Sequence, residues 1–158
     1  PQHQYSVLQE NMTIDDANAR YVEASAAVFK VNETSNALNL TFKLKVDLPD
    51  DSKVHATAFK WINDGYRYRV IQLTKTIKEA IEMETFDLQT LFVQKVRPPM
   101  IWPIQKGVAY HGMGWVPDGT KFPSNIPGGR IKMEIDIMFA NRTKLCTVNW
   151  YLKLTYKK

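Results

Sequence analysis

The chain has 158 residues, of which 44% are hydrophobic, and this length and composition predict one domain with a sizeable core. Its net charge of +5 comes from lysines and arginines spread along the chain, and its single cysteine, Cys146, excludes an internal disulfide. No apolar run approaches the length of a membrane span, and the start at Pro1 without an apolar segment predicts a mature N-terminus whose signal peptide has been removed.

The N-terminal half reads as strands after a polar start. Residues 1–19 are expected to be a polar, poorly ordered segment, and residues 20–158 a single domain. Regular alternation of apolar and polar side chains, together with the hairpin dipeptide Asp64-Gly65, indicates turn-linked antiparallel strands. The predicted strands cover residues 20–31, 38–48, 53–62 and 66–73.

After residue 73 the spacing of apolar side chains changes from every second residue to the repeat of a helix. Between residues 76 and 95, apolar side chains recur at near-helical spacing, with Lys and Glu elsewhere on the cylinder. We expect one helix here, broken near Thr85 and ended by Pro98-Pro99.

The C-terminal third predicts a further strand and a long hairpin. The strand covers residues 104–116, and its three glycines indicate a bulge or a close backbone approach. After a loop of Pro and Gly, apolar and polar residues alternate with a period of two over residues 129–139 and 144–156, around a short polar turn. Since a lone hairpin is marginal in water, the fold class is mainly β, a two-sheet antiparallel β-sandwich with one helix near residues 76–95.

Four N-x-Ser/Thr sequons suggest the compartment. About one match would be expected by chance from nine asparagines, and each sequon falls in a turn, near the N-terminus or on a polar strand face. We therefore expect a secreted, extracellular glycoprotein; a chance cluster in a cytosolic protein is the alternative. The predicted glycosylation sites are Asn11, Asn32, Asn39 and Asn141.

Catalytic patterns are missing from the sequence. There is no Gly-x-Ser-x-Gly elbow and no phosphate-binding glycine loop, the three histidines lack ligand spacing, and Cys146 lies on the apolar face of a strand. We expect no enzymatic activity, no metal and no cofactor. Basic and aromatic residues alternate over 66–69, which reads as a solvated strand face, so no nucleic-acid partner is expected.

Apolar surface is what the sequence does offer. Two sheets packed face to face can enclose an apolar space that holds a lipid-like ligand by burial alone. The alternative is a closed sandwich with a surface, storage or protein-interaction role and no ligand. An internal cavity above about 300 Å³ separates the two.

The sequence also resembles a family. Residues 102–110 read Trp-Pro-Ile-Gln-Lys-Gly-Val-Ala-Tyr, residues 122–123 are Phe-Pro, and residues 127–132 read Pro-Gly-Gly-Arg-Ile-Lys. This resembles the C-terminal half of an insect secreted family related to the lipid-recognition (ML) superfamily, which includes the ganglioside activator protein and CheA-type chemosensory proteins. That family's pattern is a helix, Cys-Pro-x-x-Lys-Gly-x-Tyr-Tyr, and a Pro-x-Gly turn before two last strands. The resemblance covers residues 86–154.

The resemblance implies a secreted, non-enzymatic sandwich of immunoglobulin-like ML type that carries a lipid, a fatty acid or a pheromone-like molecule between its sheets. Trp102 replaces the family's cysteine, and no partner cysteine occurs near residues 71–78, so the disulfide that ties the helix region to the sheet is absent. The fold is expected to be retained without this disulfide, and the size and mobility of the cavity entrance do not follow from the resemblance. A receptor or a membrane surface is a further candidate partner.

Alternation selects the residues that would contact the ligand by facing inward and excluding water. Burial of the opposite faces, Lys43 or Glu134 for example, would contradict this choice. The inward positions are Leu40, Phe42, Leu44, Ile135, Ile137, Phe139, Val148, Trp150 and Leu152, with Phe86, Leu91 and Phe92 as the lid.

Overall fold

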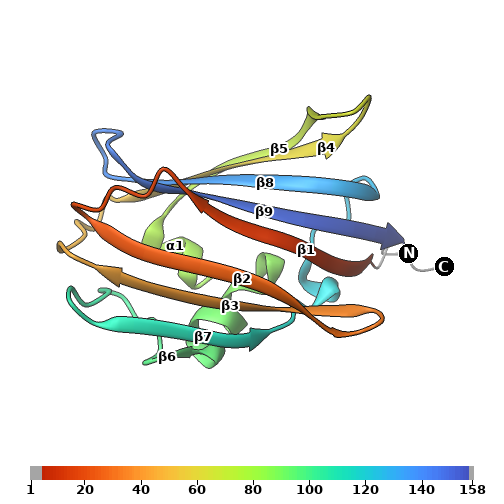
Figure 1. Ribbon diagram of the computed structural model, residues 1–158. Helices are drawn as coiled ribbons and strands as arrows, with labels where there is room; N and C mark the ends of the chain where they lie inside the picture. The colour runs from red at the N-terminus through yellow and green to blue at the C-terminus, as the bar shows by residue number, and fades with distance from the viewer. Residues whose placement is uncertain (1–4, 157–158) are drawn as a thin grey trace.

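Nine strands form two antiparallel sheets in residues 5–156, the part of the chain that the computed structural model describes (Figure 1). The sheets lie face to face, which confirms the predicted fold class of a two-sheet β-sandwich. In spatial order the larger sheet contains β1 (Tyr5–Asp15), β9 (Lys144–Tyr156), β8 (Gly129–Met138), β4 (Lys53–Trp61) and β5 (Tyr66–Thr76). The smaller sheet contains β2 (Val22–Asn32), β3 (Ser35–Leu44), β7 (Ala109–Trp115) and β6 (Val96–Arg97).

The hairpin of β8 and β9 lies at the centre of the larger sheet. Met133 pairs with Trp150 and Ile131 with Leu152, and all four side chains are buried between the sheets. The alternating polar residues face outward, so the period of two places one face in the core and the other in water.

The prediction of a poorly ordered N-terminal segment is wrong for residues 5–15, which form β1 and pair with β9 along their length. Residues 1–4 lie outside the described part. A bulge between Gln9 and Asn11 shifts the alternation by one residue and weakens the sequence signal for a strand. The hydroxyl of Tyr5 donates to the backbone carbonyl of Ile126 and fixes the start of β1.

The predicted helix over residues 76–95 is three short pieces: α1 (Ile77–Ile81), a 3₁₀ turn η1 (Thr85–Asp87) and a π-helical turn η2 (Thr90–Lys95). Thr76 and Glu79 cap α1 reciprocally. The break at residue 85 is confirmed, because Phe86 and Asp87 adopt left-handed backbone angles, with φ of 64° and 62°. No helix within residues 5–156 is long and apolar enough to span a bilayer.

The strand predicted over residues 104–116 is shorter than expected and begins at Ala109. The predicted bulge is confirmed: Leu40 pairs with Gly112 but Leu38 with Trp115, and Gly114 has a φ of 72°. A 3₁₀ turn, η3 (Gly119–Lys121), follows.

The helical pieces lie between the two sheets (Figure 1). They join β5, the edge of the larger sheet, to β6, the edge of the smaller one. On the opposite side, β1 and β2 contact each other directly. The interior is therefore bounded by two sheets, a strand contact and the helical segment, which we call the lid (residues 77–95).

A candidate ligand cavity between the sheets

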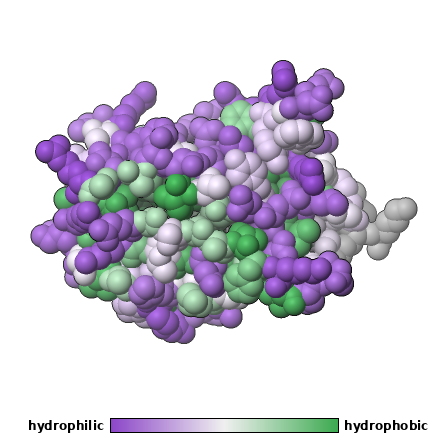
Figure 2. Space-filling model, viewed as in Figure 1, coloured by the Kyte–Doolittle hydropathy of each residue, from purple (hydrophilic) through white to green (hydrophobic). Residues whose placement is uncertain are grey.

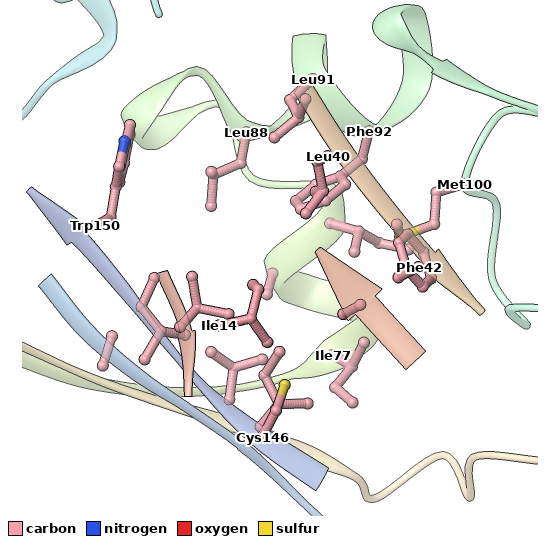
Figure 3. Close-up of a pocket in the computed structure, with 18 of the residues that line it drawn as sticks. Ile14, Leu40, Phe42, Ile77, Leu88, Leu91, Phe92, Met100, Cys146 and Trp150 are labelled. Carbon is pink, nitrogen blue, oxygen red and sulfur yellow. The ribbon is translucent and has the colours of Figure 1, made fainter. Parts of the chain in front are cut away.

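An apolar cavity of about 200 Å³ lies between the sheets and beneath the lid (Figure 3). Strands of both sheets and the lid contribute to its wall, and within the described part of the chain all the lining residues are apolar. The lining residues are Met12, Ile14, Val22, Ala24, Leu40, Phe42, Leu44, Leu48, Val54, Ala56, Leu73, Ile77, Ala80, Ile81, Met83, Phe86, Leu88, Leu91, Phe92, Met100, Ile104, Trp115, Met133, Ile135, Ile137, Leu145, Cys146, Val148 and Trp150.

The cavity volume is smaller than about 300 Å³, the value chosen in the sequence analysis to distinguish a ligand carrier from a closed sandwich. Ligand pockets for drug-sized molecules measure roughly 300–1,000 Å³, whereas a dry apolar cavity of about 150 Å³ can bind benzene. The observed cavity therefore matches one small ring or a short alkyl chain, and a larger ligand requires the sheets or the lid to move.

The structure brings ten of the twelve predicted ligand contacts to this wall: Leu40, Phe42, Leu44, Phe86, Leu91, Phe92, Ile135, Ile137, Val148 and Trp150. Leu152 is buried elsewhere in the core, and Phe139 lies beyond β8 with its ring edge-on to Tyr21, 5.0 Å between centroids. Lys43 is exposed and Glu134 is half-exposed, so the faces chosen from alternation are the correct ones. That these residues bind a ligand stays a prediction.

Sequence reasoning missed wall residues from many segments, among them β1, β2, β4, β5, α1 and the loop after the lid. Met12 and Ile14 come from β1, which was expected to be poorly ordered, although they alternate with Asn11 and Thr13. Leu73 on β5 and Met100 after the lid reach the cavity through the tertiary fold. The apolar–polar alternation on β1, at Val22 and Ala24 on β2, and at Val54 and Ala56 on β4 is a local signal that could have identified these positions.

The lid is pinned to the loop that follows β7. Phe86 is buried with its ring edge-on to Phe122, 5.2 Å between centroids. The buried carboxylate of Asp87 accepts hydrogen bonds from the indole N–H of Trp115 at 3.3 Å and from the backbone N–H of Asp118 at 3.0 Å. These contacts hold two consecutive residues in a conformation that non-glycine side chains rarely adopt.

A buried glutamine joins the two sheets at the end of the cavity marked by Trp150. The Gln9 amide donates to the carbonyls of Asn36 at 3.0 Å and Trp115 at 2.9 Å, and it accepts from the Trp150 indole N–H at 3.2 Å. The Trp115 and Trp150 rings lie 5.6 Å apart. Both indole N–H groups are thus satisfied away from the cavity, which leaves its wall apolar.

Cys146 is buried on the wall (Figure 3). Burial, followed by the charge of Asp136, raises the pKa of its thiol from an ordinary value of 9.0 to about 11. At neutral pH the thiol is therefore protonated and behaves as a small apolar side chain.

Several polar side chains on the outer face of the larger sheet pair with one another. His55 hydrogen-bonds Thr74 at 2.8 Å and Gln72 at 3.2 Å on the outer face of the larger sheet. Asp136 pairs with Lys144 at 3.3 Å. Within residues 5–156 no group of three or more His, Cys, Asp or Glu side chains is arranged to hold a metal ion.

The four sequon asparagines lie at the surface. Asn11, Asn32 and Asn141 are exposed, and Asn39 is half-exposed. The side-chain oxygens of Asn32 and Asn141 accept the backbone N–H two residues on, and that of Asn39 accepts from Gly114 across the strands. Sugars could extend into solvent from each position.

Fold and cavity together define an antiparallel β-sandwich with an apolar interior space. No family model matches the sequence, and no curated protein matches it at a significant level. Chicken MD-1 complexed with lipid IVa has a TM-score of 0.38 at 12% identity, over 91% of this chain and 98% of that chain. A Niemann-Pick type C2 protein from the Japanese carpenter ant has a TM-score of 0.34 at 12% identity, over 94% and 92%. The resemblance to CheA-type and ganglioside-activator proteins stays a prediction.

Proposed function

We propose that this protein is a secreted, non-enzymatic glycoprotein that binds and carries a hydrophobic small molecule between its two sheets. The observation that supports the proposal is the cavity of about 200 Å³ with a wholly apolar wall. Close packing normally fills a core of this size with side chains, and a space of this volume is costly to leave empty.

The wall constrains the ligand. Burial of a charged or unpaired polar group against it would cost several kcal/mol, so the part of the ligand inside is hydrocarbon or an uncharged ring. A polar head, if the ligand has one, stays outside the wall. Each buried methylene contributes about 0.8 kcal/mol, close to fourfold in affinity.

Secretion and glycosylation are part of the proposal. They are supported by the four surface sequons. The single buried thiol, which forms no disulfide, counts against secretion, but a core of this size is stable without one. Polar side chains dominate the upper rim of the molecule, while apolar residues reach the surface in the band between the sheets (Figure 2). A receptor or membrane surface could contact that band.

A homologous series of 1-alkanols, measured by displacement of a fluorescent apolar probe, tests ligand binding. Affinity should rise about fourfold per methylene and stop rising at the length that fills the cavity. Native mass spectrometry of enzymatically deglycosylated protein, purified from its source, would show the natural ligand as excess mass that organic extraction removes. A flat series with no excess mass would contradict the proposal.

Two substitutions on one strand provide a matched pair. Ala24 on β2 lines the cavity, whereas Ala27 on the same strand is exposed. Ala24→Leu should fill part of the space and weaken probe binding at least tenfold with the fold retained, and Ala27→Leu should leave binding unchanged. Equal effects of the two variants would place the probe elsewhere.

The closed sandwich is the second candidate, and the small volume favours it. In that case the side chains of the core close the cavity in solution. The protein then acts through its surface, in storage, display or protein interaction. The alkanol series would then be flat, and Ala24→Leu would change stability alone.

A further inference from the structure

A second depression lies on the outer face of the larger sheet, away from the cavity. It is a groove of about 340 Å³ lined by Glu10, Asn11, Thr13, Tyr66, Arg130 and Tyr151. Unlike the cavity, its lining mixes polar groups with two aromatic rings. It also contains the first and last residues of a sequon, Asn11 and Thr13.

Strand register places Asn11 beside an aromatic ring. Asn11 on β1 pairs directly with Tyr151 on β9, and both are on the outer face. Directly opposite residues on antiparallel strands have Cβ atoms about 4.5–5.5 Å apart. A group attached to the Asn11 amide therefore begins within reach of the Tyr151 ring.

The aromatic surface extends beyond Tyr151. Tyr66 belongs to β5, which β4 and β8 separate from β9 in the sheet, yet its ring centroid lies 5.7 Å from that of Tyr151. The Trp61 ring packs edge-on against Tyr66 at 4.9 Å. The end of the β4–β5 hairpin thus brings a second ring to the groove. At its rim, Arg130 pairs with Glu10 at 3.3 Å.

We propose that the groove is the seat of an N-linked glycan on Asn11, whose first sugar, an N-acetylglucosamine, packs on the rings of Tyr151 and Tyr66. This inference rests on the proposed secretion and glycosylation and is independent of the ligand in the cavity. A glycan is the expected occupant of the groove, because the acceptor residue Asn11 is one of the residues that line it.

The glycan is attached to the nascent chain by transfer of an oligosaccharide to the Asn11 side chain. The donor is an oligosaccharide activated as a lipid diphosphate. The Asn11 amide nitrogen forms a bond to the anomeric carbon, the bond from that carbon to the phosphate oxygen breaks, and the lipid diphosphate leaves with the electron pair. The amide loses one proton to solvent.

The groove suits the chemistry of the sugar. The face of an aromatic ring is electron-rich, and the C–H groups on one face of a pyranose carry partial positive charge, so the two surfaces attract. Thr13 and the Glu10–Arg130 pair offer hydrogen-bonding partners for hydroxyl and acetamide groups. The other three sequon asparagines have no aromatic ring as their paired residue: Asn39 pairs with Ala27, Asn32 with Ser35, and Asn141 lies outside the strands.

One variant made in two hosts isolates the contribution of the glycan. Asn11→Gln and wild type are produced in secretory eukaryotic cells and in bacteria, and each melting temperature is measured. Asn11→Gln should lower the melting temperature by about 2–4 °C more in the eukaryotic protein than in the bacterial one. In a Tyr151→Thr background, which keeps a strand-forming residue but removes the ring, this extra loss should vanish. Asn32→Gln, at the exposed end of β2, should show no difference between hosts.

Glycopeptide mass spectrometry of the same eukaryotic protein separates the outcomes. Sugar at Asn11 with a loss that depends on Tyr151 supports the inference. An unoccupied Asn11 beside occupied sequons, or an occupied Asn11 whose effect persists in Tyr151→Thr, overturns this inference alone. No sugar at any of the four sites overturns the proposed glycosylation as well, while the alkanol series still reports on the cavity.

Discussion

Two polar side chains outside the cavity, Asp87 and Gln9, allow tryptophan rings to form part of an apolar wall. The indole N–H groups of Trp115 and Trp150 would each be an unsatisfied donor in the core if Asp87 and Gln9 did not accept from them. An unpaired buried donor costs about 1–3 kcal/mol. The aromatic surface that lines the cavity therefore depends on two residues that do not line it.

Gln9→Ala should be strongly destabilising. The change leaves the Trp150 N–H and two backbone carbonyls without partners and opens a void, for a loss of about 2–4 kcal/mol and roughly 5–12 °C in melting temperature. Gln72→Ala, on an exposed position of β5, is the matched control and should stay within about 0.5 kcal/mol of wild type. Similar melting temperatures for the two variants would contradict this role for Gln9.

Cys146 makes stability fall at high pH. Its pKa in the folded state is about 11, above the ordinary value of 9.0, so the folded protein retains the thiol proton where the unfolded chain loses it. The contribution is complete below pH 9 and is lost as the pH rises to 11, by about 2–3 kcal/mol.

Denaturant titrations between pH 8 and pH 11 measure this loss. Because tyrosines and lysines titrate in the same range, the wild type is compared with Cys146→Ala, whose stability should fall less steeply. Parallel curves for the two proteins would show that the thiol does not contribute.

At the scale of elements, the strands were predictable where one face is apolar without interruption. β3, β8 and β9 alternate over most of their length, and their ends agree with the sequence prediction within a few residues. β1 was missed because a bulge at residue 10 moves the inward positions from Gln9 to Met12. The periodicity of residues 76–95 predicted a helix, but Phe86 and Asp87 are held in left-handed geometry by contacts distant in sequence.

Asp87 is expected to hold the lid. Asp87→Ala removes the acceptor for Trp115 and replaces a residue that tolerates a positive φ, so amide hydrogen exchange in residues 86–95 should accelerate about tenfold or more. Asp87→Asn keeps an acceptor oxygen and the tolerance for this geometry, and its effect should be clearly smaller. Equal acceleration in both variants would show that neither the hydrogen bond nor the backbone preference holds the segment.

At the scale of the whole molecule, alternation placed ten of the twelve selected residues on the wall, because two facing sheets must turn their apolar faces toward each other. Volume could not be predicted in this way. It depends on the distance between the sheets and on side chains such as Leu73 and Met100, which the fold brings to the cavity from other segments.

The cavity has a mechanical consequence. An interior space of about 200 Å³ per molecule is roughly 120 mL per mole, comparable with the volume that pressure unfolding removes from whole proteins. The empty protein should therefore unfold at unusually low hydrostatic pressure, as followed by tryptophan fluorescence in a pressure cell, and Ala24→Leu should raise the midpoint. A bound molecule should do the same without any mutation, so the pressure midpoint of freshly purified protein would report its occupancy before the ligand is identified. Equal midpoints for wild type and Ala24→Leu would mean that the space closes in solution.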